Sequence, residues 1–187
     1  MYLNGEKPKN LRECLERLKK SSQQLTSDEY GFDRDNGIFN PPASEKEIKE
    51  YEESFGITFP DDYREFLKFS NGATVMGVEI YGLDSVGMDD DYVPDGYLAL
   101  TYNETTNTRL AISETDGKMY MVMDHEPNPH RFESFLMHQL EICEEEIIAV
   151  QKKKEQAAKS PETLKKEKEK YDDLIARMKK AIEADRK

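Results

Sequence analysis

The sequence predicts an α+β fold, in which an antiparallel sheet of about four to six strands is flanked by helices and followed by a charged C-terminal helix. Apolar residues recur at helical spacing before Gly72. They alternate with polar residues at the period of strands between residues 78 and 123, and helical spacing returns from Ser134. Apolar residues make up 36% of the 187, which is enough for one core, and 8 Phe with 10 Tyr argue against a disordered chain.

The first helix is predicted behind Asn10. Asn10 and Glu13 have the spacing of a capping box, and leucines follow at helical spacing. Ser21-Ser22 is expected to end this helix early. Residues 26–43 are rich in turn residues and predict an irregular connection.

Two short helices are predicted after this connection. Ser44, with a Glu three residues later, opens a clear capping box, and Gly56 suits the end of that helix. Asp61 or Asp62 is expected to cap the second helix, and Asn71-Gly72 stops it. So small a helical pair needs a sheet or another helix to pack against.

Four strands are predicted by the alternation that follows. Thr115-Asp116-Gly117 is a hairpin signal, because Asp-Gly tolerates positive φ. The acidic segment 84–96, with its Gly and Pro residues, predicts an exposed loop. The strands are expected at residues 78–83, 97–102, 109–112 and 118–123.

The last part of the chain is predicted to be helical. A long helix begins at Ser134, and its apolar stripe should cover the sheet with Leu136, Leu140, Cys143, Ile147 and Val150. Behind Ser160-Pro161, a Lys/Glu-rich helix carries a narrow apolar stripe. That stripe either packs back on the domain of a monomer or pairs with another chain in a weak homodimer. We therefore expect a domain over residues 1–150 and a charged helical extension over residues 151–187.

The expected core draws on the helices before the strands, on the strands and on the long helix. Each of its members lies on the apolar side of its periodic pattern. These residues are Phe55, Phe66, Leu67, Ile80, Leu100, Ile112 and Leu136.

The charge is unevenly divided along the chain. Residues 151–187 hold 13 Lys and Arg against 8 Asp and Glu, while the whole chain holds 27 against 39. Residues 1–150 therefore hold 14 basic and 31 acidic residues, a net charge of −17. A field of that sign attracts basic proteins and repels phosphate backbones, so we expect a protein partner and no nucleic acid. The alternative, that the acidity only keeps the protein soluble, stays open.

No membrane contact is expected either. The longest apolar run, residues 119–123, is far shorter than the roughly 20 residues that span a bilayer. The first ten residues lack the apolar stretch of a signal peptide. Cys14 and Cys143 match no CxxC or zinc spacing and fit a reducing compartment. These observations predict a soluble, cytoplasmic protein.

Neither an enzyme nor a cofactor is predicted. The sequence contains no GxxxxGK[ST], GxGxxG or GxSxG motif, and neither Cys has a catalytic signature. Asp124-His125-Glu126 and His130 offer metal ligands, but adjacent residues of an extended chain point to opposite faces. Asp89-Asp90-Asp91 lacks the alternating ligand spacing of an EF-hand loop.

The acidic loop and the strand ends beside it are the candidate surface for binding a partner. Carboxylates there would steer a basic partner, and the tyrosines among them would supply apolar anchors. The alternative, a loop that only solvates the domain, stays open. The candidate contacts are Asp84, Asp89, Asp90, Asp91, Asp95, Glu104, Asp124, Glu126, Tyr92, Tyr97 and Tyr102.

One segment of the chain carries a specific combination of motifs. It spans residues 40–73 and contains Pro41-Pro42, the kink Gly56-Ile-Thr-Phe-Pro60, the helical pairs Asp62-Tyr63 and Phe66-Leu67, and the terminal Asn71-Gly72. In this order the motifs resemble the opening signature of the SUKH superfamily, of the Smi/Knr type. The resemblance extends over roughly residues 8–150, with later segments agreeing in kind.

The resemblance implies an α+β domain without catalytic residues. Members of the superfamily include bacterial immunity proteins, which neutralise toxin domains that are often nucleases, and fungal regulators of cell-wall assembly. It therefore implies either an immunity protein or a regulatory scaffold. Residues 151–187 go beyond the usual domain, so the resemblance assigns them no role.

Overall fold

The structure is a computed structural model that describes residues 2–3, 5–26, 37–87, 91–158, 166, 170, 171 and 175. The chain divides into two compact units, Met1–Ile148 and Ala149–Lys187. All strands and the first three helices belong to the first unit, and the fourth helix runs from the first unit into the second. The expected division into a domain over residues 1–150 and an extension stays a prediction.

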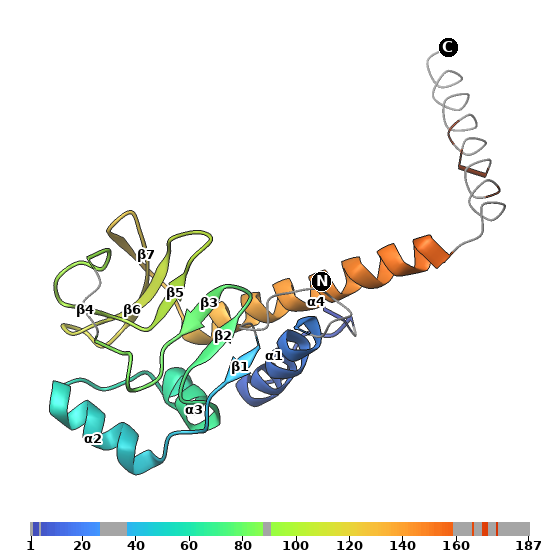
Figure 1. Cartoon of the computed structure of the whole chain (residues 1–187). Coiled ribbons are helices and arrows are strands. Elements are labelled where there is room, and N and C mark those ends of the chain that lie inside the picture. Colours follow the sequence, from blue (N-terminus) through green and yellow to red (C-terminus); the bar gives the residue numbers. More distant parts are fainter. Residues whose placement is uncertain are drawn as a thin grey trace. The chain divides into compact units, whose positions relative to one another are not determined.

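Within the described residues the chain forms helices and antiparallel sheets, so the predicted α+β class is confirmed (Figure 1). The helices are α1 (Leu11–Leu25), α2 (Glu45–Phe55), α3 (Asp61–Phe69) and α4 (Phe132–Ala158). None of the helices in this part of the chain is long and apolar enough to cross a membrane.

The strands are divided over two sheets, where the sequence led us to expect one. The first sheet has the order β1-β2-β3-β5 and the second the order β4-β6-β7-β8. The strands of the first sheet are β1 (Ile38–Phe39), β2 (Ala73–Val75), β3 (Val78–Ile80) and β5 (Thr101–Asn103). Those of the second are β4 (Tyr97–Ala99), β6 (Arg109–Ser113), β7 (Met119–Met123) and β8 (Glu126–Pro129).

The segment expected as one strand over residues 97–102 is broken at Leu100. The Leu100 backbone N–H donates to the carbonyl of Leu110, toward the second sheet, while its carbonyl accepts the N–H of Tyr81 from the first. Leu100 is fully buried at the point where the chain passes from β4 in the second sheet to β5 in the first, so this residue connects the two sheets.

The predicted helix starts are partly confirmed. Asn10 accepts the backbone N–H of Glu13, and Ser44 with Glu47 forms a complete capping box. Helix α1 continues through Ser21-Ser22 to Leu25, however, so the predicted early end was wrong. Both serines are buried against the body, and that packing outweighs their weak helix propensity.

The predicted cap of α3 was also wrong. Pro60 stands at the cap position and no side chain caps this helix. Asp62 instead accepts the backbone N–H of Glu133 with Oδ2, at 3.0 Å, in the first turn of α4. A carboxylate from one helix thus satisfies an amide at the start of another.

A single core connects the helices with both sheets. It contains six of the seven predicted residues, all except Phe55. Phe55 is 52% exposed at the end of α2, where it stacks on Tyr51 with ring centroids 4.5 Å apart. After the left-handed turn at Gly56, Ile57 and Phe59 enter the core instead.

Helix α4 begins at Phe132, two residues before the predicted Ser134. Four members of its predicted stripe are buried, and the fifth, Val150, is half-buried. Most of the predicted final helix, with its start at Ser160-Pro161, lies outside the described residues. Lys166, Lys170, Tyr171 and Ile175 are described, and each is helical.

Candidate functional site

The pairing of the strands separates the predicted contact residues into two groups. In the second sheet Arg109 pairs with Val122, so the turn at 104–108 and the turn at 124–125 lie at the same end. At the opposite end Tyr97 pairs with Ser113, beside the turn at 114–116. The predicted residues at the first end are Tyr102, Glu104, Asp124 and Glu126, whereas Asp95 and Tyr97 belong to the second.

An aromatic stack organises the first end. Tyr92, from the loop, lies parallel to His125 with ring centroids 5.0 Å apart and an interplanar angle of 11°. The guanidinium of Arg109 lies 4.9 Å from the ring centroid of Tyr92 and 4.2 Å from that of Tyr102. Arg109 is only 8% exposed, so this cation is held beneath the tyrosines and fixes them in place.

The turn between β7 and β8 supplies His125, the outer ring of this stack. Asp124 and His125 have φ values of 50° and 64°, a conformation found in the tight turns of β-hairpins. Asp and His adopt positive φ less readily than Gly, so the turn holds these two side chains at some cost in backbone energy. His130 lies beyond β8 rather than in this turn. No metal-binding group of three His, Cys, Asp or Glu side chains occurs among the described residues.

Among the described residues, the carboxylates at this end have no cationic partner. Glu104, Asp124 and Glu126 are exposed and form no ion pair there, whereas several exposed carboxylates of the helices are paired. The paired ones include Glu16 with Arg12, Glu50 with Lys46, Glu53 with Lys49, and Glu65 with Lys68. The unpaired carboxylates therefore make this end of the second sheet locally negative.

The outer face of the first sheet continues this surface. Cross-strand neighbours run from Ile38 through Thr74 and Glu79 to Tyr102. Together with Glu104 they line a shallow hollow of ≈ 270 Å³. Ile38 is 45% exposed, and Glu79 is a further exposed carboxylate that forms no ion pair in the described part of the chain. The face therefore combines apolar and acidic groups.

We call this surface the acidic face. It consists of Ile38, Glu79, Tyr92, Tyr102, Glu104, Asp124, His125 and Glu126, with Arg109 beneath them. Four of these residues were not predicted to belong to a binding surface: Ile38, Glu79, Arg109 and His125. The position of Glu79 could have been predicted, because it alternates with the apolar Val78 and Ile80 and must therefore point outward. No sequence pattern indicates the contacts of Arg109, since its tyrosine partners come from distant segments.

The second group of predicted residues lies apart from the acidic face. Tyr97 packs edge-on against Tyr120, with ring centroids 5.4 Å apart. Asp91, Asp95 and Tyr97 line a separate hollow of ≈ 470 Å³. The hydroxyl of Tyr120 donates to Asp116, which raises the pKa of Tyr120, and a hydrogen bond from the Lys118 backbone lowers the pKa of Asp116.

The remaining candidates belong to neither group as described. Asp84 is exposed in the turn that follows β3. Asp89 and Asp90 lie outside the described residues, so their predicted part in binding stays a prediction.

Comparison with known proteins gives two findings. A model of the SMI1 / KNR4 family (SUKH-1) matches residues 42–164, which is more than half of the chain. The uncharacterized protein YnaB of Bacillus subtilis (strain 168) is 38% identical over 68 residues. That alignment covers 35% of this chain and 47% of YnaB, so the chain matches about half the length of this relative.

Proposed function

The chain belongs to the SMI1 / KNR4 family (SUKH-1), and from that premise we propose that it is an immunity protein, which binds a basic toxin domain, of the nuclease class, and neutralises it. The proposed contact is the acidic face. The protein acts by occupying the surface that the toxin uses for its substrate, and it needs no catalytic residue of its own.

The observation that carries the proposal is the set of unpaired carboxylates. Glu79, Glu104, Asp124 and Glu126 are exposed and form no ion pair with another described residue, whereas several other carboxylates of the chain are paired. Like charges on one surface repel one another and lower the stability of the free protein. A basic partner relieves that repulsion on binding, so the arrangement favours complex formation.

The aromatic stack supports the same proposal. Interfaces take much of their binding energy from a few Tyr, Trp and Arg side chains, which are most effective when they are held rigidly. Arg109 contacts both Tyr92 and Tyr102, and His125 stacks on the ring of Tyr92. A partner's Arg or Lys can stack on these rings while the surrounding carboxylates accept its hydrogen bonds.

A nuclease is the class of toxin that this chemistry suits. Nucleases bind phosphodiesters through basic surfaces, and a protein with a net charge of −17 over residues 1–150 can imitate the charge of that substrate. Electrostatic steering then raises the rate of capture, which matters for a toxin that must be intercepted before it acts.

Neither thiol of the chain is suited to nucleophilic chemistry. Burial raises the pKa of both Cys14 and Cys143 to about 12. Thiolates, not thiols, are the reactive form, so neither side chain is a ready nucleophile at neutral pH.

The test is to neutralise the acidic face and measure the rate of association. The partner is first identified by capture from the native host on the full chain. The purified partner is then mixed with a variant carrying Glu79→Gln, Glu104→Gln, Asp124→Asn and Glu126→Gln. We expect the association rate at about 50 mM salt to fall by at least tenfold, with a weaker dependence on salt.

The matched control removes the same number of charges elsewhere. It carries Glu16→Gln, Glu50→Gln, Glu53→Gln and Glu65→Gln, all exposed and ion-paired on helices. Its association rate should stay within about twofold of the parent's. An equal loss in both variants would show that net charge, and not this face, controls binding.

A second readout concerns the nature of the partner. An immunity protein should abolish the partner's nuclease activity at equimolar concentration. A captured partner that is neither basic nor an enzyme acting on nucleic acid would contradict the proposal and favour the regulatory scaffold that the sequence left open.

A further inference from the structure

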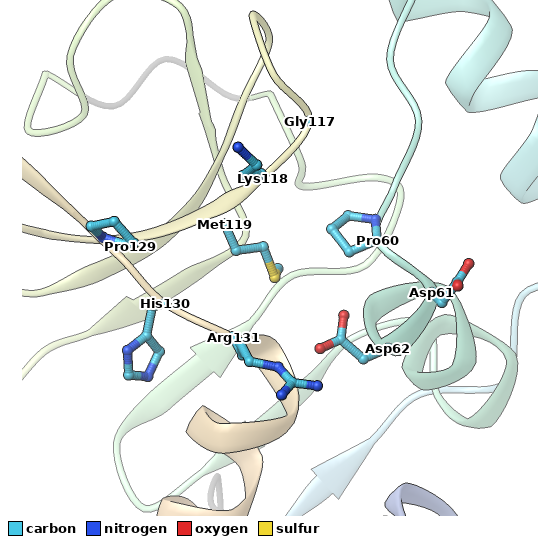
Figure 2. A pocket seen from close by; sticks show the side chains of 9 residues that line it. All are labelled: Pro60, Asp61, Asp62, Gly117, Lys118, Met119, Pro129, His130 and Arg131. Carbon is cyan, nitrogen blue, oxygen red and sulfur yellow. The ribbon is translucent and has the colours of Figure 1, made fainter.

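A third hollow lies at the other end of the second sheet, away from the acidic face. Its volume is ≈ 450 Å³, within the range of small-ligand sites. It lies where the start of α3, the hairpin between β6 and β7, and the link from β8 to α4 meet (Figure 2). No function considered above uses it.

The hollow has an apolar floor. Met119 is buried on β7, and Figure 2 shows its thioether pointing toward the ring of Pro60. Pro129, on β8, closes the side beside Met119. Proline rings and a polarizable thioether adapt to branched or aromatic side chains, so the floor suits one apolar side chain.

Two opposite charges enter the hollow beside this floor. Figure 2 shows the carboxylate of Asp62 and the guanidinium of Arg131 on the same side of Met119. They form no ion pair with each other, although both are described. The carboxylate of Asp61, in contrast, points away from Met119 (Figure 2). Lys118 also lines the hollow, but its ammonium pairs with Asp116 at 3.3 Å. Asp62 and Arg131 are therefore the anion and the cation that remain beside the floor for a ligand.

Both charges can accept a further partner. Asp62 receives the backbone N–H groups of Tyr63 and Glu133, each at 3.0 Å, one on each oxygen. A carboxylate has about four acceptor positions, so each oxygen keeps one. Arg131 is 76% exposed at its side chain and reaches Glu133 only at 3.6 Å, a weak contact that a better-placed carboxylate can replace.

We propose that this hollow binds a free apolar α-amino acid. The ammonium group donates to Asp62, the carboxylate accepts from Arg131, and the side chain lies on the floor formed by Met119, Pro60 and Pro129. An α-amino acid carries both charges and an apolar group on one carbon, which is the combination that this lining complements. Its recognition does not depend on the proposed toxin.

The two charges also determine what is rejected. A peptide C-terminus supplies the carboxylate without the ammonium, and a peptide N-terminus supplies the ammonium without the carboxylate. Each leaves one protein charge without the ion pair that the free amino acid supplies. We therefore expect each to bind about tenfold more weakly than the free amino acid.

The experiment titrates the full chain with three matched probes and follows backbone amide shifts by NMR. The probes are L-phenylalanine, N-acetyl-L-phenylalanine and L-phenylalaninamide, which share the side chain and differ in charge. L-phenylalanine should shift the amides of Gly117, Lys118 and Met119, with a Kd on the order of 1 mM. Each of the other probes should bind about tenfold more weakly.

Single variants assign each charge to its residue. Arg131→Gln should weaken L-phenylalanine and N-acetyl-L-phenylalanine by about tenfold and leave L-phenylalaninamide unchanged. Asp62→Asn should have the reverse pattern, and Asn keeps an oxygen that can cap α4. The matched controls are Arg12→Gln, in an exposed helical ion pair, and Asp61→Asn, whose carboxylate points away.

Several results would overturn the proposal. Equal affinities of the three probes would mean that the hollow takes only the apolar side chain. Unchanged amide shifts at residues 117–119, up to saturation of the probe in solution, would mean that it takes none of them. An equal loss of affinity in the control variants would place the effect in net charge rather than in this site.

Discussion

The buried ion pair between Arg17 and Glu144 is the strongest single polar link between α1 and α4. Glu144 is only 2% exposed, and both its oxygens lie within 2.9 Å of the Arg17 guanidinium. It also accepts the backbone N–H of Leu3 at 2.7 Å. The carboxylate is thus compensated on both oxygens, which is the condition for keeping a charge inside a protein.

Removing the cation alone should therefore be costly. We predict that Arg17→Ala lowers the free energy of unfolding by about 3 kcal/mol, because it leaves a buried carboxylate without its partner. Urea denaturation followed by circular dichroism measures the change. The comparison is Arg12→Ala, which breaks the exposed pair with Glu16 and should cost less than about 1 kcal/mol. Equal costs for the two variants would show that burial of the pair contributes nothing.

At the scale of single residues, the sequence predicts burial well where a periodic pattern is long. Phe66, Leu67 and Leu136 lie inside such patterns and are fully buried. The prediction that Phe55 is buried was wrong, because Phe55 is the last residue of its helix and the chain turns at Gly56 before the apolar stripe would face inward again. The contacts of Arg109 with the tyrosines were not predicted, because a cation–π contact between distant segments leaves no local spacing in the sequence.

At the scale of elements, the start of α4 depends on a residue of α3. Asp62 accepts the N–H of Glu133 at 3.0 Å and thereby joins the two helices by a cap that neither contains alone. Helix starts need such acceptors, because their first amides have no partner within the helix.

We predict that Asp62→Ala lowers the free energy of unfolding by about 1–2 kcal/mol, the usual cost of losing an N-terminal cap. Thermal or urea unfolding measures it. Asp61→Ala, one position earlier and without such a bond, should change stability by less than about 0.5 kcal/mol. If both variants lose the same stability, the contribution comes from charge at the start of α3 rather than from the cap.

Element prediction succeeded where the pattern was local and long. All four predicted segments contain strands, although the one over residues 97–102 is divided into β4 and β5, and the hairpin at Thr115-Asp116-Gly117 joins β6 to β7 as expected. The strands β1, β2 and β8 were not predicted. Two of them have two or three residues, too few for an alternation to be visible, and β8 contains Pro127 and Pro129. Prolines are tolerated there because β8 is an edge strand.

At the scale of the whole molecule, charge is sorted by element. Several exposed carboxylates on α1, α2 and α3 form ion pairs, whereas Glu79, Glu104, Asp124 and Glu126 of the acidic face form none with the described residues. The sequence predicted a negative domain but not this difference, because pairing on helices follows local spacing whereas the acidic face is assembled from several separate strands and turns. The proposed binding surface therefore carries carboxylates whose charge no neighbouring cation offsets.

The last residues of α4 contribute little to the fold of the first unit. Its last buried side chain is Ile147, and residues 151–157 are all exposed. The family match nevertheless runs to residue 164, beyond the predicted domain boundary at residue 150. Sequence similarity thus places the end of the domain near residue 164, whereas burial places it near residue 150. Truncating the chain at each position distinguishes between these two boundaries.

We predict that a chain ending at Val150 still unfolds cooperatively and that its free energy of unfolding falls by no more than about 1 kcal/mol. The reason is that residues 151–157, at the start of the removed segment, are all exposed. Calorimetry of this chain and of one ending at residue 164 measures the difference. If the shorter chain alone loses its cooperative transition, residues 151–164 are part of the domain and the boundary given by burial is wrong. If both keep it, the domain is complete by Val150, and the segment shared with the family beyond that point is left free to serve binding rather than stability.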